Sequence, residues 1–427
     1  MSPPTLAASW RKARLSDDRL FAFESGIWTG EKPPLVECFV IRNTNFTKEG
    51  VLNLTNVAVI PIEQRQLARK RLTRGDIIIE RSGGGPEQPV GRVALFDEAE
   101  GDYCFSNFTS RLRVKDRGEV DPAYLHLYLF YFHISGQTER LQRRTTGIRN
   151  LDFAAYRDTS VPQPPLPEQR AIAHALRVVQ AARAARQREA ALERGRKAAL
   201  MQHLFTHGTR GEARKKTEIG EIPESWRVVP LREVTRPTTS VNPEQQPGGL
   251  FTYVDVSSVS NESFTIVEPK QLIGRDAPSR ARKLIRTNDV IFATVRPALR
   301  RVAMIPPELN NQICSTGFCV LRACTDDLEP TYLFFALLTE RIARCVETLQ
   351  KGATYPAIND PDLFDQLIPL PPLDEQYKIG DALRACDAKI AALQQEAATL
   401  DELFRALLEE LMTGRLSAAP LIVGTIP

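Results

Sequence analysis

The sequence predicts two copies of a mixed α/β domain, separated by two long α-helices that form an antiparallel coiled coil with an internal pseudo-twofold repeat. Three observations lead to this fold class. A Pro-rich phrase occurs twice, the residues around it repeat at a constant shift, and a helix-like segment follows each copy. The chain of 427 residues is long enough for two or three domains with their own cores.

The repeat is centred on the two Pro-rich phrases. PQPPLPEQRAI at 162–172 and PLPPLDEQYKI at 369–379 are separated by a constant 207 positions. The same shift aligns the residues downstream without a gap, from Ile172 with Ile379 to Thr206 with Thr413. Weaker matches extend upstream, where Asp76 lies opposite Asp289. An internal duplication of this length defines the repeating unit of the fold.

Each block upstream of a phrase contains strand-like runs of Val, Ile, Phe and Tyr, broken by Gly, Pro, Asn and Asp. The runs are ECFVIRN, GDIIIER and GRVALF in the first block, and FTYVDVSS, NDVIFATV and RRVAMIP in the second. A short helical segment follows in each, AYLHLYLFYF and TYLFFALLTERIARCV. Each block is therefore predicted to be a mixed α/β domain.

The segment after the second phrase is predicted to be one long helix. Its apolar and small residues recur at alternating steps of four and three from Ile379 to Leu411, which is the heptad pattern of a coiled-coil seam. Residues 374–411 would form a helix about 57 Å long. The nearest partner for this seam is the sister helix, and a pseudo-twofold axis would make the pair antiparallel, with the domains at opposite ends.

The first helix departs from this pattern. Its seam begins with Ile172, Leu176 and Val179 and then meets four charged residues, Arg183, Arg186, Glu193 and Lys197. Three interpretations are open. The seam shifts to Ala182, Ala185, Leu192 and Ala199, the arginine stripe faces a partner, or it forms a solvated basic face.

The repeat gives the expected boundaries. They are residues 1–160 for the first domain, 161–210 for the first spacer helix, 211–367 for the second domain, 368–417 for the second spacer helix and 418–427 for a C-terminal tail.

Composition limits the class of protein. A formal net charge of +4, with 42% apolar and 25% charged residues, is ordinary for a globular protein and permits a nucleic-acid partner without requiring one. No run approaches the roughly 20 apolar residues that span a bilayer. The N-terminal stretch has no apolar core, and the seven cysteines are scattered, so a reducing cytoplasm is expected.

No catalytic centre is recognisable. The sequence has no Walker-type loop, no Asn/Asp-Pro-Pro-Tyr tetrad and no nuclease-like carboxylate cluster. His203 and His207 lie one helical turn apart without a third ligand, and Cys314, Cys319 and Cys324 are spaced by five rather than as CxxC pairs. The histidines are expected to face solvent or an interface, and the cysteines to be buried in strands, with no metal site.

The layout resembles the specificity subunit of type I restriction–modification systems. Two differing α/β blocks alternate with two matching helices, each helix opens with a PLPEQ-type phrase, and GIRNL (147–151) or GATYPAI (352–358) lies just upstream. The resemblance covers essentially the whole chain. It implies a non-catalytic DNA sequence-specificity subunit with two target-recognition domains, each reading one half of a bipartite double-stranded DNA site, while the helices set the spacer and dock methyltransferase subunits.

The same resemblance implies the partners and cofactors. Two methyltransferase subunits and two motor/nuclease subunits would complete the complex in a bacterial or archaeal cytoplasm, with no membrane partner. S-adenosylmethionine, ATP and Mg²⁺ would belong to those partners, and this chain would hold no cofactor.

DNA contacts are expected on loops at strand ends, from side chains that hydrogen-bond base edges or phosphates. The first-block candidates are Arg42, Asn43, Thr44, Asn45, Arg81, Ser82, Gly83, Gly84, Arg143, Arg144, Thr146 and Arg149. The second-block candidates are Ser257, Ser258, Arg282, Lys283, Thr294, Arg296, Arg300, Arg301, Lys351, Thr354 and Tyr355.

Other readings of these residues stay open. The three glycines at 83–85 would allow close approach to a nucleic-acid backbone or would form a plain flexible hairpin, and Arg81 and Arg296 would otherwise pair with local carboxylates such as Glu80. At the level of the whole chain, the alternatives are a stand-alone duplicated DNA-binding regulator, a coiled-coil scaffold without a DNA role, or an enzyme with an unrecognised site.

Overall fold

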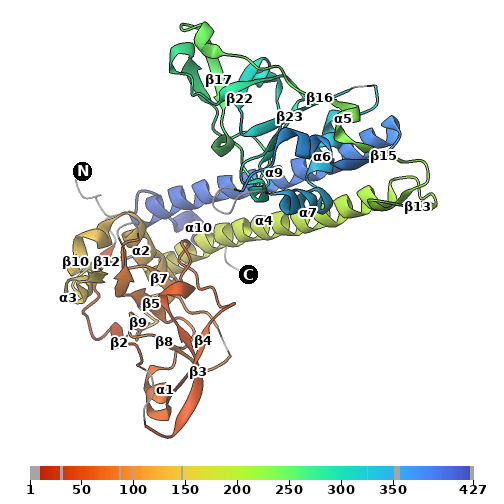
Figure 1. Cartoon of the computed structure of the whole chain (residues 1–427). Coiled ribbons are helices and arrows are strands. Elements are labelled where there is room, and N and C mark those ends of the chain that lie inside the picture. The colour runs from red at the N-terminus through yellow and green to blue at the C-terminus, as the bar shows by residue number, and fades with distance from the viewer. Residues whose placement is uncertain are drawn as a thin grey trace. The chain divides into compact units, whose positions relative to one another are not determined.

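Two compact units make up the chain, one of residues 1–186 and 396–427 and the other of residues 187–395. The computed structural model describes residues 10–28, 32–85, 88–98, 100–145, 148–324, 326–350 and 356–423. Each unit combines an α/β domain with one half of each long helix, α4 (Leu166–His207) and α9 (Leu373–Met412) (Figure 1).

The α/β domain of the first unit contains four small sheets. Their strand orders are β2-β9-β5-β7, β4-β3-β8, β10-β11-β6 and β1-β12. The strands are β1 (Arg11–Arg14), β2 (Phe21–Ser25), β3 (Leu35–Ile41), β4 (Ala58–Glu63), β5 (Ile77–Glu80), β6 (Ser82–Gly84), β7 (Val93–Leu95), β8 (Tyr103–Phe105), β9 (Thr109–Val114), β10 (Gln142–Thr145), β11 (Ile148–Leu151) and β12 (Ser160–Gln163). All pairings are antiparallel except β3 with β8, which is parallel.

The second unit repeats part of this plan and has four sheets of its own. Their orders are β16-β23-β20-β21, β18-β17-β22-β19, β15-β24 and β13-β14. The strands are β13 (Arg214–Thr217), β14 (Gly220–Pro223), β15 (Arg227–Pro230), β16 (Thr235–Arg236), β17 (Leu250–Val254), β18 (Lys270–Ile273), β19 (Ala281–Ile285), β20 (Val290–Ala293), β21 (Val302–Met304), β22 (Gln312–Ser315), β23 (Phe318–Ala323) and β24 (Leu367–Leu370). As in the first unit, one parallel pair, β17 with β22, lies among antiparallel ones.

Short helices connect these strands. In the first unit they are η1 (Asn43–Asn45), α1 (Gln64–Lys70), α2 (Pro122–Ile134), η2 (Gln137–Leu141), α3 (Phe153–Arg157) and α10 (Ala419–Val423). In the second they are α5 (Leu231–Val234), η3 (Pro243–Gln245), η4 (Val256–Ser258), η5 (Gly274–Asp276), η6 (Pro297–Leu299), η7 (Pro307–Leu309), α6 (Pro330–Leu337), α7 (Glu340–Leu349) and α8 (Asp360–Phe364). The predicted fold class is confirmed, although the second apolar helical segment is two helices rather than one.

A buried ion pair recurs at the same place in both units. Asp76 is fully buried and accepts two hydrogen bonds of 2.6 Å from Arg113, and Asp289 accepts bonds of 2.8 and 2.7 Å from Arg322. Each carboxylate also caps a turn through a backbone N–H, that of Thr73 or Arg286. The sequence match between the two aspartates therefore reflects one structural role.

A two-stranded ribbon, here called the neck, joins each α/β domain to its long helix. In the first unit the neck is β1 paired with β12, and in the second it is β15 paired with β24. The Pro-rich phrase begins at the end of each neck and continues into α4 or α9. The phrase therefore marks the point where domain and helix meet.

The glutamine of each phrase explains why the phrase is repeated. In the second unit, Gln376 is fully buried, its Oε1 accepts from the N–H of Glu329 at 2.9 Å, and its Nε2 donates to the carbonyls of Asp327 and Pro371, both at 2.9 Å. A single amide thus joins α9, the neck and the start of α6. Since an amide both donates and accepts, no apolar side chain of similar size can replace it.

The first unit builds the same junction around Gln169. Its Oε1 accepts from the N–H of Asp121 at 2.9 Å, and its Nε2 donates to the carbonyls of Glu119 and Pro164 at 2.9 and 2.8 Å. A tyrosine hydroxyl reinforces each neck. Tyr124 donates to the Pro162 carbonyl at 3.0 Å, and Tyr332 donates to the Pro369 carbonyl at 2.7 Å.

The preceding glutamate of the second phrase is also buried. Glu375 accepts from the indole of Trp226 at 3.0 Å and from the backbone N–H of Thr209 at 2.6 Å. In the first unit, the equivalent Glu168 accepts from Trp10 at 3.3 Å. The Glu375 carboxylate therefore ties the segment that follows α4 to the start of α9.

Within each unit, α4 and α9 run antiparallel and share the core of the α/β domain (Figure 1). In the first unit, Ile172 and Leu176 of α4 join Phe404 and Leu408 of α9 in the cluster that includes α2. In the second, Ile379 and Leu383 of α9 pack with Leu204 of α4. The apolar seam predicted for α9 is confirmed, since its residues are buried or, at Cys386, Leu400 and Leu407, half-buried.

The middle of α4 contacts α9 through charges. Arg183 pairs with Asp401, and Arg186 pairs with Glu396 at 2.7 Å. In the second unit, Glu193 accepts from Lys389 at 2.7 Å, and Lys197 pairs with Asp387 at 2.5 Å. The Lys197 ammonium also lies 4.9 Å from the ring centre of Phe335.

These contacts decide among the three interpretations of the first helix. The shifted seam is wrong, because Leu192 is 65% exposed and Ala182, Ala185 and Ala199 are exposed as well. A solvated basic face is wrong for Arg183 and Lys197, whose side chains are only 12% and 13% exposed. The stripe does face a partner, which is the acidic side of α9.

We expect the substitution Gln376→Ala to lower the free energy of unfolding by about 3 kcal/mol, because it leaves buried backbone groups of Glu329, Asp327 and Pro371 without partners. Gln394 lies on the exposed side of the same helix, so Gln394→Ala is the matched control and should change stability little. Thermal and denaturant unfolding of the full chain measure both. Equal stability of the two variants would contradict the anchoring role.

We also expect Lys197→Glu to destabilise the second unit by about 2 kcal/mol, because it puts a negative charge beside Asp387 in a mostly buried position. The double variant Lys197→Glu/Asp387→Lys should recover most of this loss. Arg194→Glu makes the same charge change on the exposed side of α4 and serves as control. If the double variant unfolds as easily as the single one, the ion pair does not hold the helices together.

Candidate nucleic-acid interface

The first candidate loop follows β3 and contains η1. Arg42 and Thr44 are exposed, whereas Asn45 is buried and its amide donates to the carbonyls of Asn53 at 3.0 Å and Asn56 at 3.2 Å. The Asn45 Oδ1 also accepts from the backbone N–H of Arg42 at 2.9 Å. Asn45 therefore shapes the loop, and Arg42 and Thr44 are the side chains that it presents.

Arg92, which directly precedes β7, holds this loop through its backbone carbonyls. Arg92 donates to the carbonyls of Asn43 at 3.1 Å and Phe46 at 3.2 Å. The buried carboxylate of Glu80 holds Arg92 through bonds of 2.8 and 2.7 Å. The partner of Glu80 in these bonds is Arg92, not the neighbouring Arg81 that the sequence suggested.

Arg81 and the glycines after it are engaged inside the unit. The Arg81 guanidinium lies over the ring of Phe153, 4.3 Å from its centre, and burial lowers the pKa of Arg81. Gly83 has a φ of +101°, and a Cβ there would lie 2.8 Å from Nδ2 of Asn43, which donates to the Ser82 carbonyl at 2.6 Å. The close approach that Gly83 and Gly84 permit is thus to the protein itself, with both residues in β6.

The basic segment before the first phrase forms strands β10 and β11. Arg143 is exposed and pairs with Asp152 at 2.5 Å, while Arg149 lies opposite Gly84 in the β11–β6 pairing. The N–H of Ala155, together with Arg143, keeps the pKa of Asp152 below its usual value. Arg144 belongs to β10, although its side chain is not described, and Thr146 lies outside the described residues.

The second unit has an equivalent loop, η4 after β17. Ser257 is exposed and Ser258 is buried. Arg301 donates to the carbonyls of Val256, Ser257 and Val259 at 3.0, 3.1 and 2.6 Å. Since Arg301 precedes β21 as Arg92 precedes β7, the repeat places one loop-fixing arginine in each unit.

Three further second-unit candidates make internal contacts. Lys283 donates to the Phe318 carbonyl at 2.6 Å and pairs with Asp360. Thr294 is buried and donates to the Gly317 carbonyl at 3.0 Å. Arg282 lies 3.3 Å from Glu244.

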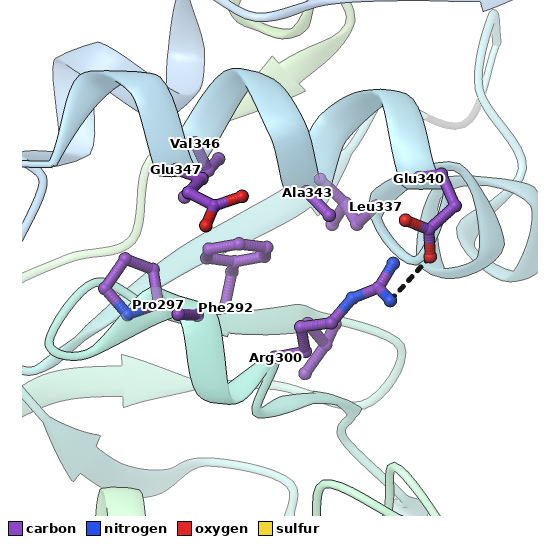
Figure 2. A pocket seen from close by; sticks show the side chains of 10 residues that line it. Phe292, Pro297, Arg300, Leu337, Glu340, Ala343, Val346 and Glu347 are labelled. Atoms are coloured by element: carbon purple, nitrogen blue, oxygen red, sulfur yellow. Dashed lines mark hydrogen bonds and ion pairs between the residues drawn. The ribbon is translucent and has the colours of Figure 1, made fainter.

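Arg296 and Arg300 flank η6, each with a left-handed backbone conformation (φ of 49° and 52°). Figure 2 shows Arg300 directed at Glu340 of α7, and its two terminal nitrogens donate to that carboxylate at 2.7 Å and to the Leu338 carbonyl at 3.0 Å. Arg300 and Glu340 line a small hollow of about 180 Å³ with Phe292 and Glu347. Arg296 is exposed.

The structure therefore divides the candidates into exposed side chains and side chains that make contacts inside their own unit. Exposed side chains are found at Arg42, Thr44, Arg143, Ser257 and Arg296. Asn45, Lys283, Thr294 and Arg301 instead make hydrogen bonds to backbone carbonyls inside their own unit. Lys351, Thr354 and Tyr355 lie outside the described residues.

Sequence reasoning selected Arg42, Asn43 and Thr44 but missed the aromatic residues that lie with them around an opening next to η1. A hollow of about 510 Å³ is lined by Trp28, Arg42, Asn43, Thr44, Asn107 and Phe108, among others. Trp28 and Phe108 are 71% and 49% exposed. The available signal was an aromatic residue inside each polar turn, GIWTG and SNFTS, but sequence alone does not separate an exposed aromatic from a buried one.

The remaining polar clusters have structural explanations. Cys314 and Cys319 are buried in β22 and β23 as predicted, but the prediction is wrong for Cys324, which is half-buried and follows the end of β23. His203 and His207 are exposed, and their stacked rings have centres 4.6 Å apart. Among the described residues, no group of three or more His, Cys, Asp or Glu is arranged to hold a metal ion. No described helix is long and apolar enough to cross a membrane.

The comparison with known proteins covers both units. Residues 41–194 and 223–402 match the model of the type I restriction modification DNA specificity domain. The chain is 26% identical over 389 residues to the MjaX specificity subunit of a type I restriction enzyme from Methanocaldococcus jannaschii, covering 88% of this chain and 87% of that one. Identity is also 26% to the MjaVIII specificity subunit of the same organism, over 68% of this chain and 70% of that protein.

A solved structure shares the fold. The type I restriction-modification system S subunit from M. genitalium superposes with a TM-score of 0.58 and 16% identity, over 96% of this chain and 98% of that chain. Because the family model matches in both units and spans most of the chain, this protein belongs to the family of type I restriction–modification DNA specificity proteins.

Proposed function

We propose that this chain is the non-catalytic specificity subunit of a type I restriction–modification complex. Each α/β domain reads one half of a bipartite double-stranded DNA site. The helices α4 and α9 set the gap between the halves and provide the docking surface for methyltransferase subunits. The chain supplies sequence recognition, and its partners supply the chemistry.

The contrast between junctions and loops carries this proposal. The junctions of the two units match atom for atom around Gln169 and Gln376, and Arg92 and Arg301 fix equivalent loops. The side chains at the equivalent positions of those loops differ, with Arg42 and Thr44 in one unit against Asp255 and Ser257 in the other. Two similar backbone frameworks that carry different side chains suit the recognition of a DNA site whose two halves differ in sequence.

The partners follow from the family and from the chain's own chemistry. We infer two methyltransferase subunits, which bind S-adenosylmethionine, and two motor/nuclease subunits, which use ATP and Mg²⁺. The relatives are named as specificity subunits of restriction enzymes, and the two similar helical halves of this chain offer two similar docking positions.

The necks give the cut points for a domain-exchange experiment. Residues 15–159 lie between β1 and β12 and can be replaced by the corresponding segment of another such subunit, leaving Gln169 and its Pro-rich phrase in place. We expect the exchange to change one half of the target and to leave the other half and the gap unaltered. Adenine-modification mapping in cells that express this chain with its methyltransferase subunit measures all three.

The reciprocal exchange of residues 231–366, between β15 and β24, is the matched control and should change the opposite half. Simultaneous change of both halves would contradict separate reading. Adenine modification that does not depend on this chain would refute the proposed function. A chain that binds its site without any methyltransferase would instead be a stand-alone regulator, and one without salt-dependent DNA affinity would be a scaffold.

The ion pairs between α4 and α9 define how to test the spacer. We expect a gap longer by at least one base pair when seven residues are inserted into α4 between Arg186 and Glu193 and seven into α9 between Lys389 and Glu396. Both flanking ion pairs, Arg186–Glu396 and Glu193–Lys389, can then form as before. Modification mapping reads the gap.

Insertion into α4 alone is the control, because it shifts the charged partners out of register and should lower stability. Unchanged half-sites with an unchanged gap in the double insertion would remove the spacer role of the helices.

A further inference from the structure

We propose that the hollow beside η1 of the first unit is a base-reading pocket, in which Trp28 and Phe108 contact the 5-methyl group of a thymine in the first half-site. This inference rests on the proposed function, since it names the residues that determine specificity at one position of the target. It concerns one unit only, so it also predicts a base preference that the second domain does not share.

The shape and lining of the hollow fit the edge of a base pair. Its volume is about 510 Å³, and Ile27, Val40 and Ile60 line it together with Trp28 and Phe108. The thymine methyl is the one apolar group that a base presents in the major groove, and proteins recognise it by apolar contact. An open hollow with these apolar side chains in its lining is therefore suited to an A·T pair.

The two aromatic side chains are exposed in the free chain. Trp28 is 71% and Phe108 49% exposed, although both stand next to well-buried neighbours in Ile27 and Thr109. Large exposed aromatic groups that lie together on a surface mark a binding site, because water contacts apolar surface that a partner would cover. DNA that docks on the loops of this domain would cover them.

The hollow also has polar groups with unused hydrogen-bonding capacity. Ser106 is only 9% exposed, and its hydroxyl has no hydrogen-bond partner within the described chain. Asn43 donates its Nδ2 to the Ser82 carbonyl at 2.6 Å, which leaves its shielded Oδ1 without a partner. Asn107 lies between Ser106 and Phe108 on the same turn. Since shielded polar groups gain most from a partner, these residues favour a ligand that both donates and accepts.

The adenine of an A·T pair meets that requirement. Its major-groove edge offers an N6 amino donor and an N7 acceptor, which an amide side chain such as Asn107 can pair with. The Asn43 Oδ1 is an acceptor for an amino group, and the Ser106 hydroxyl is a donor. Apolar and polar parts of the lining therefore point to the same base pair.

Contacts inside the unit hold the residues of the pocket in place, which recognition of a base requires. Arg92, which is held by Glu80, donates to the carbonyl of Asn43. Gly83 allows Asn43 to approach the backbone of β6. A side chain at Gly83 would displace Asn43, since its Cβ would lie 2.8 Å from Nδ2.

The second unit lacks these features at the equivalent turn. The β8–β9 turn carries Asn107 and Phe108, whereas the β22–β23 turn carries Thr316 and Gly317. Gly317 has no side chain to contact a methyl group, and a Cβ there would lie 3.0 Å from Val256. The methyl contact is thus a property of the first domain.

The test measures binding of the full chain, in complex with its methyltransferase subunit, to duplexes that contain the mapped target. Each thymine of the first half-site is replaced in turn by deoxyuridine, which removes only the 5-methyl group. We expect one of these replacements to weaken binding of the wild-type complex about three- to tenfold. Trp28→Ala and Phe108→Ala should weaken binding to the thymine duplex by a similar factor and make the complex insensitive to that replacement.

Leu250→Ala is the matched control, because Leu250 is 73% exposed in the second unit, and it should retain the wild-type response. Melting temperatures of the three variants should equal that of the wild type, since the substituted side chains are exposed. The pocket assignment is overturned if no deoxyuridine replacement in the first half-site weakens binding, or if Trp28→Ala and wild type respond equally.

Failure of the proposed function looks different from failure of the pocket. If no split target depends on this chain, both the proposed function and the pocket assignment are wrong. With such a target and no dependence on the methyl group, the function stands and the pocket assignment alone is wrong.

Discussion

The buried glutamine of each Pro-rich phrase is the contact on which each unit depends. One amide holds three chain segments together, namely the neck, the start of a domain helix and the first turn of a long helix. An amide hydrogen bond that replaces water contributes little net free energy, but its loss in a dry junction leaves several backbone groups unpaired. The junction therefore fixes the direction in which each domain leaves its helix, whatever loops that domain carries.

Charges give the long helices their register. Apolar side chains alone allow one helix to slide past another by a turn, because neighbouring positions look alike. Arg183, Arg186 and Lys197 each meet a carboxylate of α9, and Glu193 meets Lys389, so a slip in either direction would bring unpaired charges together. The weakly apolar middle of α4 is thus a means of alignment rather than a weak part of the seam.

Loop-fixing arginines separate structural from recognition roles. Arg92 and Arg301 occupy equivalent places and hold the carbonyls of η1 and η4, so the backbone of each loop is fixed by the same kind of contact. Other basic residues also make contacts inside their unit, as Lys283 does with the Phe318 carbonyl. Arg42, Thr44, Trp28 and Phe108, in contrast, are exposed in the first unit.

The sequence by itself determined the duplication, the strands, the long helices and the family. The reason is that repeats and heptads are recognisable from the order of residues alone, without knowledge of which side chains are in contact. It also placed Cys314 and Cys319 in buried strands. Only the tertiary structure decided the partners of polar side chains. Asp401 lies 218 positions from Arg183, and Gln376 meets carbonyls 5 and 49 positions away. For the same reason, the sequence could locate the candidate loops, but it could not predict which of their side chains are buried and which are exposed.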